Sequence, residues 1–110
     1  LDNGANANAA TSFGATPLIF AIKKGSPDLV KMLVEHGANV NLAQKNGDTP
    51  LMAACQEGSI PIVETLLAKG ASLEAKNENG ATALIVACGE KNTGVVWALL
   101  EKKAKIDVWT

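Results

Sequence analysis

The chain has 110 residues, the length of one compact domain, and 47% of them are hydrophobic although only 4% are aromatic. The formal net charge is −1 and the sequence contains no arginine, which argues against binding to nucleic acid. No apolar run approaches the ~20 residues that would cross a membrane, and no signal-peptide pattern opens the chain. We therefore expect an intracellular, cytoplasmic protein with an aliphatic core and no insertion into a membrane.

One octapeptide returns at a fixed interval of 33 residues: GATPLIFA begins at Gly14, GDTPLMAA at Gly47 and GATALIVA at Gly80. The segments that follow each octapeptide also match, although the third copy is altered. The first residues match the end of a unit, so they read as the tail of an incomplete one. The predicted domain is therefore a single one of residues 1–110, divided into a tail at 1–13, repeats at 14–46 and 47–79, and an atypical C-terminal repeat at 80–110.

Each unit opens with a short predicted helix. Thr16 and Thr49 are suited to cap its N-terminus, and a proline follows each of them in the first turn, where a missing N–H costs nothing. Gly25 and Gly58 are expected to end this helix after about two turns.

A second helix is predicted after Ser26 and Ser59, which look like its caps. Its apolar residues form one stripe, made of Leu29, Val30, Leu33 and Val34 in the first unit and of Ile62, Val63, Leu66 and Leu67 in the second. Gly37 and Gly70 fit the left-handed position at its end. A short alternating segment follows, and an Asn-Gly pair closes a hairpin-like loop.

This unit resembles the ankyrin repeat through its G-x-T-P-L-x-x-A core, the apolar pairs of its second helix and its GA-x-V-N close, and the resemblance covers essentially the whole chain. It implies an all-α solenoid of helix-turn-helix units with projecting hairpin loops. The chain departs from the family at two positions, which is expected to remove hydrogen bonds that brace the loops. The family's His after T-P-L is Ile19, Met52 and Ile85 here, and its Asp at the loop tip is Thr11, Gln44 and Asn77.

The residue inventory predicts no enzyme, no cofactor and no metal site. His36, the single histidine, falls at a helix end, where it is a solvated residue rather than a catalytic or metal-binding one. Cys55 and Cys88 occupy the same place in successive repeats, and we expect both to be buried free thiols rather than a disulfide, metal ligands or a nucleophile.

The family resemblance implies that partners bind to the loop tips and to the exposed face of the first helix. The corresponding positions of this chain are Phe13, Lys23, Lys24, Lys45, Asn46, Asp48, Gln56, Glu57, Glu78, Asn79 and Glu90. Their charges run from basic in the first repeat to acidic in the last. This favours a partner with the opposite gradient, unless the row is a solvated face with unselected charges.

The aromatic residues break the repeat pattern. Phe13 stands at a loop tip and is either an anchor for a partner or packed against the upstream loop. Phe20 aligns with Ala53 and Val86, which predicts that it fills the core.

Trp97 and Trp109 both fall in the last repeat, where Lys91 and Lys103 also replace the glycines that end helices elsewhere. The two tryptophans form either a cap over the open end of the stack or an exposed patch for a second domain or subunit.

The predicted function is non-enzymatic protein–protein interaction by a monomer, with the concave surface acting as a scaffold for another protein. The alternative is a structural spacer or support segment of a longer ankyrin array. Asn41, with Leu33 before it, is also similar to the hydroxylation pattern known in some ankyrin repeats.

Overall fold

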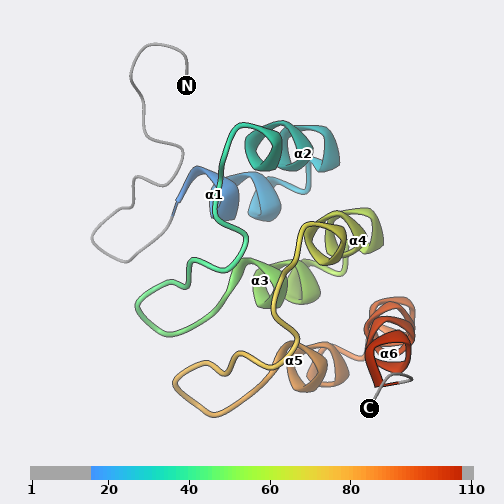
Figure 1. The fold of residues 1–110 in the computed structure, drawn as a ribbon. Helices are drawn as coiled ribbons and strands as arrows, with labels where there is room; N and C mark the ends of the chain where they lie inside the picture. Colours follow the sequence, from blue (N-terminus) through green and yellow to red (C-terminus); the bar gives the residue numbers. More distant parts are fainter. Residues whose placement is uncertain (1–15, 108–110) are drawn as a thin grey trace.

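The computed structural model describes the backbone of residues 16–107 and the side chains of residues 16–103. Six helices lie in this part of the chain, and they form three antiparallel pairs stacked on one another (Figure 1). The described residues contain no strand. The helices are α1 (Pro17–Lys24), α2 (Pro27–Glu35), α3 (Pro50–Glu57), α4 (Ile60–Ala68), α5 (Ala83–Gly89) and α6 (Thr93–Asp107).

The first helix of each pair begins at a threonine cap, as predicted. The Oγ1 atoms of Thr16, Thr49 and Thr82 accept hydrogen bonds at 3.3, 3.2 and 3.4 Å from the amide three residues later. Gly25 and Gly58 end α1 and α3 in the left-handed conformation.

The second helices begin at Ser26, Ser59 and Asn92, whose side-chain oxygens each accept a backbone hydrogen bond three residues on. Helices α2 and α4 are followed by the predicted left-handed glycines, Gly37 and Gly70. The helix ends there because the backbone reverses into the loop.

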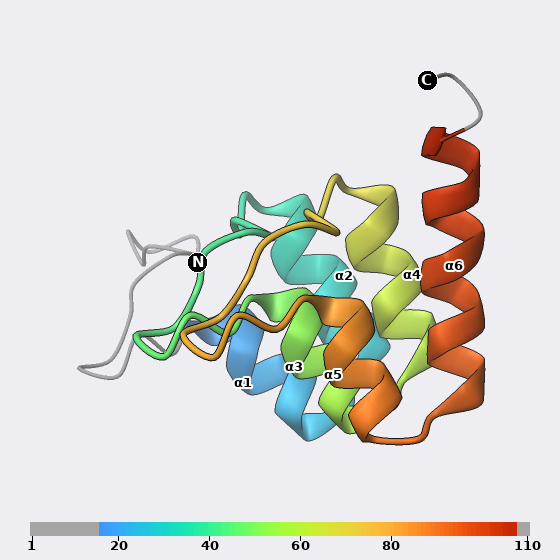
Figure 2. The ribbon, with the colours of Figure 1, turned by 90° about the horizontal axis from the view of Figure 1, so that it is seen from below.

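The last repeat treats its two lysines differently. Lys91 adopts the left-handed conformation, with φ of 58°, in the position of Gly25 and Gly58. Lys103, in the position of Gly37 and Gly70, remains helical, so α6 runs on to Asp107 and extends past the other helices (Figure 2). The expectation of a left-handed Lys103 was wrong because continuing the helix avoids the steric cost of that conformation.

The core lies between the layers of helices. Helices α1, α3 and α5 pack in one row and α2, α4 and α6 in the other (Figure 1). The middle pair is covered on both sides, so all residues of α3 from Pro50 to Cys55 are buried. Small and aliphatic side chains fill this space because adjacent helices come close together.

Two predictions about the core were wrong. Phe20 is 53% exposed, because its side of α1 faces away from the second repeat. Cys88 is exposed while Cys55 is buried, because Cys88 lies on the outer side of the last repeat and no further helix covers it within the described residues. The repeat pattern predicts burial only where a neighbouring repeat is present.

Candidate functional site: loop tips and inner helices

The two described loops project to the same side of the stack, beside the inner helices (Figure 1). Each closes at a tight turn on its Asn-Gly pair. The amide of Gln44 donates to the carbonyl of Asp48 at 2.9 Å, and that of Asn77 donates to the carbonyl of Ala81 at 3.0 Å. The predicted hairpin-like tips are therefore present, although they form as turns without strands in this part of the chain.

Asp48 organises the first tip through its carboxylate. Oδ2 accepts from the side-chain amides of Asn46, at 3.3 Å, and Gln56, at 3.4 Å. Oδ1 accepts from Asn77 at 2.9 Å. One side chain thus joins the loop tip to α3 and to the next loop, so Asp48 positions the surface in addition to belonging to it.

Asn77 braces the second tip. Its Oδ1 accepts from the amides of Asn79 and Ala81, at 2.9 and 3.0 Å. The family's Asp is missing here, but the Asn in its place supplies the same kind of acceptor. The expected loss of bracing was therefore wrong for this loop, and the Asn at the family's Asp position was the signal that could have shown it.

The two tips also touch one another directly. The amide of Glu78 donates to the carbonyl of Asn46 at 2.9 Å. Gly47 makes room for this contact, because a Cβ added to it would lie 2.8 Å from Cα of Asn77. The tips are consequently held in fixed register along the row.

The predicted charged residues lie on the same row. Lys23 and Lys24 are exposed in the last turn of α1, and Glu90 is exposed directly after α5. The remaining exposed members are Lys45, Asn46, Gln56, Glu57, Glu78 and Asn79, whereas Asp48 is half-buried. The order of charges from Lys23 to Glu90 follows the order of the stacked helices.

A shallow hollow of about 340 Å³ lies between the tips and is lined by Gln44, Lys45, Asn46 and Glu78. A larger groove of about 440 Å³ lies at the other edge, between the loop that follows α4 and the C-terminal half of α6. Neither hollow has a nucleophile in its lining. Across the part of the chain that the structure describes, no three His, Cys, Asp or Glu side chains come together as metal ligands.

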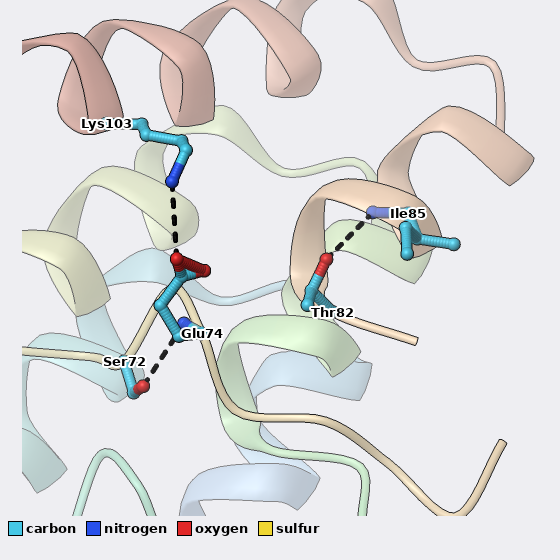
Figure 3. A network of polar contacts seen from close by, with 5 residues as sticks. All are labelled: Ser72, Glu74, Thr82, Ile85 and Lys103. Carbon is cyan, nitrogen blue, oxygen red and sulfur yellow. Dashed lines mark hydrogen bonds and ion pairs between the residues drawn. The ribbon is translucent and has the colours of Figure 1, made fainter. Parts of the chain in front are cut away.

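A second set of bonds links the repeats where the loops begin. The side chain of Asn41 donates to the carbonyl of Gly70 at 3.2 Å and accepts from the amide of Ser72 at 2.7 Å. One repeat later, Glu74 Oε1 pairs with Lys103 Nζ at 3.2 Å, as Figure 3 shows, and Ser72 Oγ accepts from the amide of Glu74. Sequence reasoning missed these links because each joins residues 29 positions apart.

The family comparison agrees with this architecture. The sequence model described as "Ankyrin repeats (3 copies)" matches residues 1–77 and, again, residues 41–109. The chain belongs to the ankyrin repeat family. Ankyrin repeats are generally protein–protein interaction modules and generally not catalysts. The comparison with curated proteins found no match.

Three predicted residues need separate mention. Phe13 and Trp109 lie outside the described residues. Trp97 lies on α6 of the last ankyrin repeat and is 66% exposed, so its own ring is not buried over the end of the stack. Within the described residues, none of the helices has the length and apolar character needed to span a membrane.

Proposed function

We propose that this ankyrin domain binds a partner protein through its loop tips and the exposed face of its inner helices, without catalysing a reaction. The contact between the Glu78 amide and the Asn46 carbonyl, at 2.9 Å, supports this proposal best. It fixes neighbouring tips before any partner arrives. A surface ordered in advance loses little conformational entropy on binding, which favours affinity.

The charges of this surface suggest the character of the partner. Lys23, Lys24 and Lys45 lie towards the first described repeat, while Glu57, Glu78 and Glu90 lie towards the last. We propose a protein whose contact surface is acidic at one end and basic at the other, because complementary potentials speed association and exclude wrong partners. Phe13 remains a proposed anchor at the basic end.

The competing function is a spacer or support within a longer array, for which the tips would have no partner. The units at 14–46, 47–79 and 80–110 would then serve only to hold further repeats in place. We also propose a reducing, cytoplasmic setting, because Cys55 and Cys88 are both free thiols and Cys88 is exposed.

Affinity capture from a lysate of the source cell distinguishes these functions. The natural chain is compared with a Lys45→Glu, Glu78→Lys variant, which exchanges two charges without touching Asp48. Lys31→Glu on α2, an exposed residue on the other row of helices, is the control. Mass spectrometry should identify a protein held by the natural chain and the control but lost by the variant. Equal retention by all three proteins contradicts the proposed site, and no retention by any favours the spacer.

A further inference from the structure

The last repeat ends in an apolar surface, which we call the C-terminal end face. Its exposed members are Ile85, Cys88, Trp97 and Leu100, with exposed fractions of 57% for Ile85 and 66% for Trp97. Val96 lies half-buried among them on α6. Terminal repeats of solenoids usually carry a polar outer side, and a contiguous exposed apolar patch marks a site of interaction.

The same repeat positions are buried inside the stack. Ile19 and Met52, the counterparts of Ile85, are buried against the repeat that follows each of them. Cys88 and Leu100 likewise have the buried counterparts Cys55 and Leu67. The C-terminal end face therefore has the composition of an internal interface between repeats, and it lacks only the neighbour.

The opposite end presents the complementary positions. Within the described residues, Phe20, Leu29 and Met32 are exposed on the outer side of α1 and α2, with Phe20 at 53% and Met32 at 47%. We call these three the N-terminal end face. Their equivalents Ala53 and Ile62 are buried against the repeat that precedes them.

We propose that the C-terminal end face of one copy packs on the N-terminal end face of a second copy, so that the stack continues in the register of its internal repeats. Continuity with the internal interfaces carries this inference, since α5 and α6 would meet α1 and α2 as α3 and α4 meet α5 and α6. This association replaces the monomer expected from the sequence. It does not depend on the loop-tip function.

The register specifies contacts across this junction. Glu64 and Ala98 line one hollow between α4 and α6. One repeat further, the same positions are Trp97 and Met32 of the second copy, and a thioether beside an aromatic ring is a favourable contact. Glu90 likewise comes one repeat step from Lys24 of the second copy, which places opposite charges at the rim.

A head-to-tail contact joins two different faces, so it leaves one face of each kind free and extends into chains of copies. Sedimentation velocity of the full chain with reductant should therefore show a reversible rise of mean mass with concentration, beyond that of a dimer. Trp97→Glu should keep the chain monomeric at concentrations where the natural chain associates. Lys31→Glu, at the same repeat position in the first repeat, should associate as the natural chain does.

A mixing experiment separates head-to-tail packing from other arrangements. Met32→Glu blocks one face and Trp97→Glu blocks the other, so each variant alone should be monomeric. An equimolar mixture should form dimers and nothing larger, because only one pair of intact faces remains. If Met32→Glu alone still dimerises, two C-terminal end faces pack on each other and the proposal is wrong.

Cys88 reports on the face directly, because it is exposed there while Cys55 is buried. A short iodoacetamide pulse, read from peptide masses, should label Cys88 about twofold more slowly when half of the chains are associated. A labelling rate that is the same at every concentration, together with a monomeric mass, overturns the proposal. Slow labelling in a monomer also overturns it, since the face would then be covered by the chain's own residues.

Discussion

Glu74 and Lys103 form an ion pair, with 3.2 Å between Oε1 and Nζ, at the same two repeat positions that Asn41 and Gly70 occupy one repeat earlier. In the earlier pair the amide of the Asn41 side chain donates to a backbone carbonyl. In the later pair α6 continues through the position of the glycine, so its lysine side chain supplies the donor instead. The link between repeats is kept although its chemistry changes.

Glu74→Gln should lower the free energy of unfolding only slightly, by about 0.5 kcal/mol or less, because both side chains of this pair are largely exposed. Urea denaturation at low and at high salt checks this. The difference between variant and natural chain should shrink in high salt. A loss that persists there would mean that Glu74 acts through packing rather than charge.

Asn41→Ala should cost more, about 1 kcal/mol or somewhat above, because it removes two hydrogen bonds to the next repeat, at 3.2 and 2.7 Å. Asn41→Asp keeps the acceptor for the Ser72 amide but lacks the donor for Gly70, so its stability should fall between the two. Denaturation midpoints measure the order. Alanine and natural chains of equal stability would show that water replaces these bonds without loss.

Gly47→Ala should destabilise the domain more than Gly80→Ala, although both residues have positive φ, 86° and 78°, and hold the same repeat position. An added Cβ at Gly47 would lie 2.8 Å from Cα of Asn77, whereas at Gly80 no atom lies within 4 Å. Both variants pay about 1 kcal/mol for the left-handed backbone. Thermal unfolding of the pair isolates the contact between the tips, and equal losses would refute it.

Lys91→Gly should raise the free energy of unfolding by about 0.5 to 1 kcal/mol, because Lys91 holds φ at 58°. Lys103→Gly should have the opposite effect and cost about 1 kcal/mol, since that position lies within α6. The two substitutions are chemically identical, so their opposite signs in chemical denaturation would be informative. Stabilisation by both would mean that α6 ends at Lys103 in solution.

Repetition made most of the fold predictable. The 33-residue spacing identified the helix pairs, and the threonine and serine caps were correct because they depend only on local chemistry. The errors fell at the ends of the stack. Phe20 and Cys88 are exposed because burial in a solenoid depends on a neighbour, and the pattern of one repeat does not say whether the neighbour is there.

The candidate site was predictable as a set of positions but not as a network. The sequence placed Lys45, Asn46 and Glu78 on the tips. The hydrogen bonds from Asp48 to Asn77 and from Glu78 to Asn46 join residues about one repeat apart, and only the stacked geometry brings them together. Spacing within one unit could not show them.

Burial raises the pKa of the Cys55 thiol from 9.0 to about 12. Between these values the unfolded chain has lost the thiol proton and the folded chain keeps it, so stability falls as pH rises, by about 1.4 kcal/mol per pH unit from this group. Below pH 9 this contribution is fully present. Cys55→Ala lacks it, so the deficit of this variant at pH 7 should narrow by about 1.4 kcal/mol at pH 10 in urea denaturation with reductant. Parallel losses in the two proteins would show that Cys55 is not the cause.

The middle helix pair, α3 and α4, is the one covered on both sides within the described residues. Opening its amides to solvent therefore requires at least one neighbouring pair to detach first. Amide hydrogen exchange should be slowest there, with α1 and α5 exchanging through partial openings that leave the middle intact. Folding is then expected to start at the centre and to add the outer pairs one at a time.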